Sequence, residues 1–406
     1  MRAYAAFGVH RSGSTGDHET AQWLQQRLRR AGYDVRRDDI AINTVLEPWA
    51  DVRAGAIETR AFVQLFAPEA AWGSTIEAPL VRAGQGAALS GAIAVVPEPA
   101  PATAYWPADH DGPVHALAAA GARAAILNVA APNGDIYALN RDIHAPRFPI
   151  PVLLVGADTH TQLLQASGSS ASIAMGGPLV PEQTHVISAR KSGQGRGIVI
   201  STPLTGWFTC GAERGAGVAL LLALGEALRD VDAPVLLLGT GGHEIGHIGM
   251  HEATVSAPSP DEVALWVHLG SSIASLAAPG SSERNPAQYT FVSAAMTPLA
   301  QRLLGPVAPQ VVEVGADGPG ETGQVIGRLC AHHRLCGRAS RFPYAAGRRV
   351  AVRSRLARTN RRPYAGRARG ARSMMQRLWP LAVLLIAMAA CACTARGADA
   401  QRAACA

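Results

Sequence analysis

Two stretches of this chain decide its fold: GIVISTPLTGWFTCGAERGAGVALLLALGEAL at residues 197–228 and PVLLLGTGGHEIGHIGM at residues 234–250. Each begins with the short apolar run typical of a buried strand and continues into a glycine-rich loop. The first stretch then enters a helix rich in alanine and leucine. Apolar strands that alternate with helices predict a mostly parallel sheet covered by helices on both faces. In such sheets chemistry gathers just beyond the carboxyl ends of the strands, which here are residues 202–216, 241–247 and 268–271.

The same alternation continues on both sides of these stretches. HVISARK at residues 185–191 is expected to pair with GRGIVIST at residues 195–202, and VALWVHLGS at residues 263–271 is expected to form a further strand. Near the N-terminus, apolar residues recur at helical spacing between residues 21 and 31, which predicts an amphipathic helix. Asp17 is its expected N-cap.

Changes in composition divide the 406 residues into four segments. Residues 1–69 and 176–327 read as two parts of one α/β domain, and residues 70–175 read as an inserted β-rich module bounded by stretches rich in proline, alanine and glycine. Residues 328–406 form an arginine-rich tail. The chain is long enough for two or three domains, each with its own core.

The charge of the chain is concentrated in that tail. From Arg328 onward there are 17 arginines and one acidic residue, Asp399, so residues 1–327 carry a net charge of about −9 although the formal total is +7. The globular part is therefore acidic. The tail lacks lysine and interleaved aromatic residues, so we do not expect a nucleic-acid partner.

One apolar run, WPLAVLLIAMAAC at residues 379–391, lies inside the tail. It is shorter than the roughly 20 residues that span a bilayer as a helix, and its layout is that of a signal peptide at the wrong end of a protein. We interpret the tail as the product of a frameshift near residue 328; the alternative is a genuine basic tail with a membrane anchor. No signal peptide is expected at the N-terminus, which makes the cytoplasm the default location unless residues 379–391 contact a membrane.

The order of the parts resembles the co-catalytic dizinc aminopeptidases and their glutamate carboxypeptidase relatives, with an inserted protease-associated domain. The resemblance is carried by GVHRSGSTGDHETAQWLQQRLRRAGYDV at residues 8–35 and by the two stretches quoted first. It covers residues 1–327 and implies a three-layer zinc-exopeptidase fold. It also implies a metal-dependent hydrolase that acts on peptides or other small amides.

The resemblance assigns roles to particular residues. The helix-opening carboxylate that bridges two zinc ions falls on Glu213, and the second residue of the family's Glu-Glu pair falls on Glu244. The general base falls on His243, which replaces a glutamate, and a later ligand falls at His268. The family's His-x-Asp pair falls on Thr202-Pro203-Leu204, which supplies no ligand. Apart from the resemblance, the adjacent Trp207 and Phe208 are candidates to line a substrate pocket, and the alternative is that they plug the end of the strand.

A second motif overlaps these residues. His243-Glu244-Ile245-Gly246-His247 fits H-E-x-x-H, in which two histidines on one helix bind a single zinc ion and the glutamate acts as base. Three functions thus stay open. The first is a metallo-aminopeptidase with one or two zinc ions, in which His243 is catalytic and Glu213, Glu244, His247 and His268 are ligands. The others are a non-catalytic peptide-binding relative and a single-zinc protease.

Overall fold

The computed structural model describes most of residues 1–331. The described residues are 1–64, 66–103, 105–106, 110–131, 134–271, 273, 289–292, 296–304, 310–314, 318 and 320–331. The proposed frameshift product and the apolar run at residues 379–391 lie outside this set, apart from the end of one helix. Within it, no helix is both long and apolar enough to cross a membrane.

A five-stranded sheet forms the centre of the α/β domain. Its strand order is β1 (Asp34–Val45), β9 (Leu179–Lys191), β11 (Val235–Thr240), β10 (Gly197–Pro203) and β12 (Val263–His268). The three apolar strands β11, β10 and β12 are parallel, as predicted, whereas β9 runs antiparallel to both of its neighbours. The expected pairing of residues 185–191 with residues 195–202 is wrong, because β11 lies between β9 and β10.

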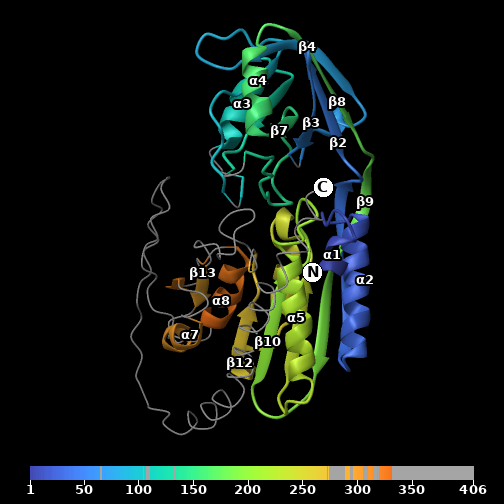
Figure 1. Cartoon of the computed structure of the whole chain (residues 1–406), viewed down its shortest axis with the longest axis vertical. Helices are drawn as coiled ribbons and strands as arrows, with labels where there is room; N and C mark the ends of the chain where they lie inside the picture. The colour runs from blue at the N-terminus through green and yellow to red at the C-terminus, as the bar shows by residue number, and fades with distance from the viewer. Residues whose placement is uncertain are drawn as a thin grey trace.

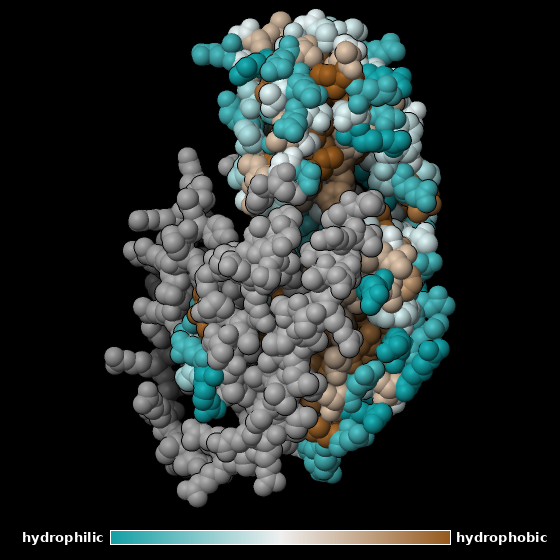
Figure 2. Space-filling view, in the orientation of Figure 1, coloured by the Kyte–Doolittle hydropathy of each residue, from teal (hydrophilic) through white to brown (hydrophobic). Residues whose placement is uncertain are grey.

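Helices cover both faces of this sheet, as the sequence predicted. On one face, α2 (Thr15–Arg30) and α5 (Gly215–Leu228) bury their leucines against strand residues such as Ile187, Ile200 and Leu237. On the other face, α6 (Ile248–Ser256) contributes Ala253 to a smaller apolar cluster. Neighbouring residues of one strand reach opposite clusters because successive side chains in a strand point to opposite faces. In Figure 2, brown apolar atoms lie between α5 and the teal outer face of α2.

The inserted module is a closed seven-stranded barrel with two helices, α3 (Asp111–Ala119) and α4 (Ala157–Gln165). Its first strands lie upstream of the predicted boundary at residue 70, so the insert begins near Trp49. These two strands, at residues 49–54 and 57–63, alternate charged with apolar residues, and nothing in the sequence indicates that they pair with strands at residues 170–176 and 152–155. Around the barrel the strands are β2 (Trp49–Ala54), β3 (Ile57–Val63), β7 (Val152–Val155), β6 (Ala124–Asn128), β5 (Ile93–Val95), β4 (Thr75–Arg82) and β8 (Ser170–Gly176).

The barrel sits at one end of the sheet, and the ribbon of β1 and β9 leads from the sheet toward it (Figure 1). The described C-terminal part ends with α8 (Glu321–Ala331), which continues past the predicted segment boundary at residue 328 and packs on α6 and β12. The remaining elements are short or lie at the periphery: α1 (Arg2–Ala5), η1 (Glu69–Ala71), η3 (His243–Ile245), η4 (Pro260–Glu262), β13 (Tyr289–Val292), α7 (Thr297–Leu304) and β14 (Gln310–Glu313).

A buried carboxyl group fixes the start of α2. Ser14, rather than the predicted Asp17, is the N-cap, and its hydroxyl oxygen accepts from the Asp17 backbone N–H at 3.3 Å. The Asp17 carboxylate in turn accepts from the Gly13 N–H at 3.0 Å. Because Asp17 is fully buried, desolvation raises the pKa of its carboxyl group to about 7.

This pKa predicts a pH-dependent stability. A carboxyl group with a raised folded-state pKa contributes stability below its unfolded pKa, near 3.8, and loses that contribution as pH rises toward 7. Relative to Asp17→Asn, the wild-type protein should therefore lose on the order of 4 kcal/mol of unfolding free energy between pH 4 and pH 7. Urea unfolding of both proteins across this range measures the difference. Parallel stability curves would contradict the assignment.

Candidate active site at the sheet ends

Glu244 lies in the loop after β11 and is completely buried. One carboxylate oxygen accepts from the backbone N–H of Ser12 at 2.6 Å and from its hydroxyl at 2.7 Å. The other oxygen accepts from the Thr205 hydroxyl at 2.8 Å. These three bonds join the N-terminal loop, the loop after β10 and the loop after β11. Glu244 thus connects three chain segments at the sheet ends.

Glu213 lies elsewhere in the site. Its side chain is 45% exposed and forms an ion pair with the buried Arg214 at 2.9 Å. The two carboxylates have different partners, since Glu213 pairs with Arg214 whereas Glu244 is bound by Ser12 and Thr205. The Arg214 guanidinium also donates to the Thr205 carbonyl oxygen at 3.0 Å. A positive charge therefore lies beside the position expected for a bridging metal ligand.

A different set of side chains does converge. Glu321, the first residue of α8, is 2% exposed, and its Oε1 lies 2.9 Å from Nδ1 of His243. Its Oε2 lies 3.6 Å from Nε2 of His268, at the end of β12. The Ser201 hydroxyl contacts Nδ1 of His268 at 2.9 Å and accepts from the Trp266 indole N–H at 2.9 Å. One carboxylate from the last described helix thus bridges two histidines from two strand ends.

His247 completes this cluster. Its ring centroid lies 4.5 Å from that of His243, and the Tyr105 ring of the insert packs edge-on against it at 5.1 Å. Nε2 of His247 is buried and has no hydrogen-bond partner among the described residues. Such an orphaned buried nitrogen is costly, which indicates a place for a ligand or an ion.

The three histidines of the cluster are neutral near pH 7. Burial lowers the pKa of His247 and of His268 to about 4, and burial lowers that of His243 well below its usual value. The neighbouring Arg214 charge acts in the same direction on all three, whereas Glu321 opposes the effect at His247 and His268. Neutral imidazole is the form that binds metal ions.

The H-E-x-x-H interpretation is wrong. That motif needs one α-helix to carry both histidines, but His243 lies in the short 3₁₀ helix η3 and α6 begins only at Ile248. Gly242, Gly246 and His247 all adopt left-handed backbone conformations, which break any continuous helix. Glu244, the base in that motif, is already bound by Ser12 and Thr205.

The predicted substrate residues lie where the insert meets the α/β domain. The Trp207 indole donates to the Asn140 side chain at 3.0 Å, and its ring packs against Phe62 at 5.3 Å. Phe208 is 41% exposed and also contacts Phe62. Their substrate role stays a prediction.

The insert also contacts the site loop directly through its backbone. The Arg141 N–H donates to the Glu244 carbonyl at 3.0 Å, and the Ile143 N–H donates to the Ile245 carbonyl at 3.1 Å. Sequence reasoning missed Ser12, Thr205 and Glu321. The sequence offered two weak signals, the serine-rich loop around Ser12 and the position of Glu321 at the start of a helix, and neither signal identifies the partner residue.

Comparisons with known proteins agree with this architecture. No protein-family profile matches the chain, and no curated protein does. Among solved structures, a zinc aminopeptidase from Bacillus subtilis is similar over 78% of this chain and 77% of its own, with a TM-score of 0.60 and 15% identity. A peptidase M28 precursor from Shewanella amazonensis is similar over 80% of both chains, with a TM-score of 0.57 and 15% identity. An aminopeptidase from Aneurinibacillus sp. strain AM-1 is similar over 80% and 81%, with a TM-score of 0.53 and 16% identity.

The chain has the zinc-aminopeptidase fold. This confirms the predicted fold class and the resemblance in architecture, with a β-rich insert in the expected region. At this level of identity the likeness extends to the fold, and the chemistry has to be assessed from the side chains present.

The side chains do not fit the two-zinc donor set that the fold implies. The His-x-Asp position holds Thr202-Pro203-Leu204, and the Thr202 hydroxyl donates to the Leu269 carbonyl at 2.9 Å. Glu213 is paired with Arg214, and the oxygens of Glu244 are occupied. Among the described residues, no three histidine, cysteine or carboxylate side chains form a group that could hold a metal ion as they stand.

Removal of the Glu244 carboxylate should primarily destabilise the fold. Glu244→Ala leaves the Ser12 N–H and two hydroxyl groups buried without acceptors, and each such group costs about 1–3 kcal/mol. We expect a loss of about 3 kcal/mol or more of unfolding free energy in urea titrations. The control is Glu226→Ala, which removes an exposed carboxylate from α5 and should cost less than about 1 kcal/mol. Equal losses in the two variants would contradict the structural role of Glu244.

Proposed function

We propose that this protein hydrolyses peptide or related amide bonds at a zinc site held by His243, His268 and Glu321. The carrying observation is the buried Glu321 carboxylate, whose two oxygens face imidazole nitrogens at 2.9 and 3.6 Å. These separations bracket the roughly 3.3 Å expected between neighbouring ligands at 2.0–2.1 Å around a tetrahedral zinc ion. Two histidines and a glutamate are also a known donor set for catalytic zinc.

Zinc binding would replace one of the present hydrogen bonds of this cluster. Nδ1 of His243 and Oε1 of Glu321 now form a hydrogen bond, and an ion would take the place of the proton between them. This substitution is needed because the donors do not form a metal-binding group as they stand. When bound, zinc supplies Lewis-acid polarisation of a carbonyl group.

The chain's own residues would perform the remaining tasks. Ser201 and Trp266 hold His268 in orientation, as partners of metal-bound histidines commonly do. The Arg141 and Ile143 backbone bonds hold the insert against the site loop, which helps to exclude water from it. Nε2 of His247, which has no partner in the described part of the chain, would interact with a bound substrate. In this proposal His243 is a ligand, and Glu213 and Glu244 are not.

Metal analysis tests this assignment. Purified wild-type protein should retain about one zinc ion per chain after dialysis. Glu321→Gln, which keeps the side-chain size but removes the charge, should lose most of the metal and any turnover of aminoacyl p-nitroanilides. Glu213→Gln is the matched control and should keep the metal. The opposite pattern, with metal lost only from Glu213→Gln, would restore the ligand set implied by the family resemblance.

A second candidate function is peptide binding without turnover. It is favoured by the loss of the His-x-Asp pair and by the complete occupation of the Glu244 oxygens. Wild-type protein that binds no zinc and cleaves none of the p-nitroanilides would support this candidate over the hydrolase.

A further inference from the structure

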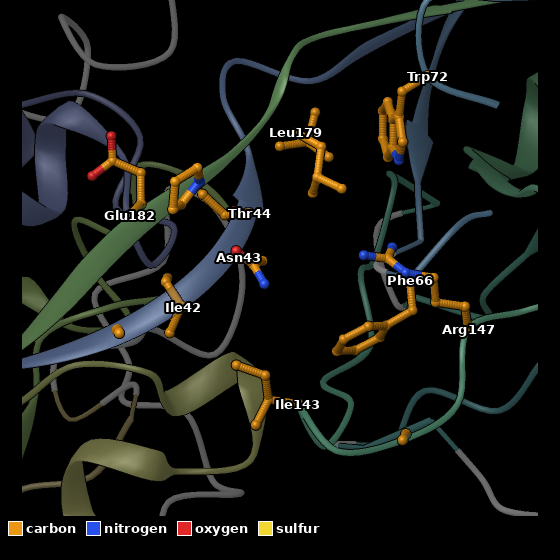
Figure 3. A pocket seen from close by; sticks show the side chains of 13 residues that line it. Ile42, Asn43, Thr44, Phe66, Trp72, Ile143, Arg147, Leu179 and Glu182 are labelled. Carbon is orange, nitrogen blue, oxygen red and sulfur yellow. The ribbon is translucent and has the colours of Figure 1, made fainter. Parts of the chain in front are cut away.

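A pocket of ≈ 390 Å³ lies between the β1–β9 ribbon and the loops of the insert (Figure 3). Its volume falls within the range of ordinary ligand sites. One wall comes from consecutive residues of β1 and the facing part of β9, and the other comes from two loops of the insert. Its lining includes Ala41, Asn43, Phe66, Trp72, Ile143 and Pro181.

The pocket reaches around the free edge of β1. Successive side chains of a strand point to opposite faces, so a pocket that touches residues 41–45 must meet both faces and the edge between them. β1 is the last strand of its sheet, with β9 as its only strand partner among the described residues. Figure 3 shows Ile42, Asn43 and Thr44 on β1 across the pocket from Phe66 and Trp72.

The hydrogen-bond register shows which backbone groups are available at this edge. The Leu46 N–H donates to the Pro178 carbonyl of the facing strand at 2.9 Å, so even-numbered residues here point toward β9. Odd-numbered residues then point outward, and the Arg11 guanidinium donates to the outward Val45 carbonyl at 2.6 Å. The N–H and C=O groups of Ala41 and Asn43 therefore face the pocket. Pro181, opposite Asn43, occupies a position that needs no N–H for the β1–β9 ladder.

The opposite wall is apolar and aromatic. It presents Phe66, Trp72 and Ile143, while Arg147 is engaged with Glu69 at 2.9 Å and with the Ala67 carbonyl at 3.0 Å. Phe66 has a φ of 75°, a left-handed conformation that is strained for a bulky side chain. Backbone strain of this kind clusters at binding sites, where it fixes a side chain in one place.

We propose that this pocket binds an extended peptide as an additional strand on the edge of β1, with one large apolar side chain against Phe66 and Trp72. Outward N–H and C=O groups at alternate residues match the backbone of an extended chain, and this mode of recognition draws affinity from main-chain hydrogen bonds. The apolar wall supplies the side-chain preference. The ligand is thus a peptide segment with a phenylalanine- or leucine-like residue.

This pocket adjoins the candidate active site without sharing its ligands. Ile143 lines the pocket, and its N–H binds the carbonyl of Ile245, the residue after Glu244. The loop that carries Ser12 lies against the same strand, because a Cβ added at Gly13 would meet Thr44 at 3.0 Å and Ile42 at 3.2 Å. The proposal goes beyond hydrolysis, since a peptide would bind here with or without turnover.

A peptide with both ends blocked tests binding separately from exopeptidase activity. Acetyl-Ala-Phe-Ala-Ala-amide should bind the full-length wild-type protein in calorimetric titrations, and the same peptide with aspartate in place of phenylalanine should bind at least about 10-fold more weakly. Asn43→Pro removes an outward N–H but leaves the β1–β9 ladder intact, which an edge strand tolerates. It should weaken binding about 3- to 10-fold, the usual effect of one lost hydrogen bond.

Matched variants keep the test decisive. Asn43→Ala retains the backbone N–H and should bind within about twofold of wild type, while Phe66→Ala should bind more weakly. If Asn43→Pro fails to fold, peptides N-methylated at a single backbone amide test the same bonds on the wild-type protein. The proposal would be overturned if the N-methylated peptides bound as tightly as the unmethylated phenylalanine peptide, or if the phenylalanine peptide did not bind. A concentration-dependent dimer of the wild-type chain that Asn43→Pro abolishes would assign the edge to a second copy and would also overturn it.

Discussion

The buried carboxylate of Glu244 is the interaction on which the sheet-end region depends. A buried charge is stable only when its oxygens are bound, and here the donors come from the Ser12 loop and from Thr205. The buried Arg11 guanidinium, beside the same carboxylate, adds a compensating charge. Because these partners come from widely separated parts of the chain, the loops after β10 and β11 and the N-terminal segment are held in one arrangement. His243, the residue immediately before Glu244, contacts Glu321 within that arrangement.

The hydrogen bonds of Glu244 occupy the oxygens that the family resemblance assigns to a metal ion. The fold is that of the zinc aminopeptidases, whereas of the two carboxylates that the resemblance singles out, Glu244 connects chain segments and Glu213 pairs with Arg214. Burial is the main cause of the lowered pKa values of the three clustered histidines, and the positive charge of that guanidinium lowers them further. A second cation in the same volume would meet electrostatic repulsion.

Local patterns predicted the elements well because each has a strong signal. The apolar runs of β10 and β11, the leucine-rich α5 and the amphipathic α2 all follow from spacing and composition. The neighbours of each strand in the sheet were harder to predict. β9 pairs with β1 and β11, and nothing in the sequence of β9 favours these partners over β10. The start of the insert was predicted too late in the sequence, because β2 and β3 carry charged residues at their outward positions and do not form continuous apolar runs. The sequence also did not predict the partners of Ser12 and Glu321, because these residues meet them only in the folded protein.

The position of Glu321 at the start of α8 has a consequence for synthesis. All three histidines of the cluster lie upstream of it, and the carboxylate that bridges two of them arrives with the last described helix. While the chain is still emerging from the ribosome, the sheet and the barrel can form before this residue is available. The nascent protein would then have the exposed edge of β1 in place, but the histidine cluster would lack its bridging carboxylate until α8 docks.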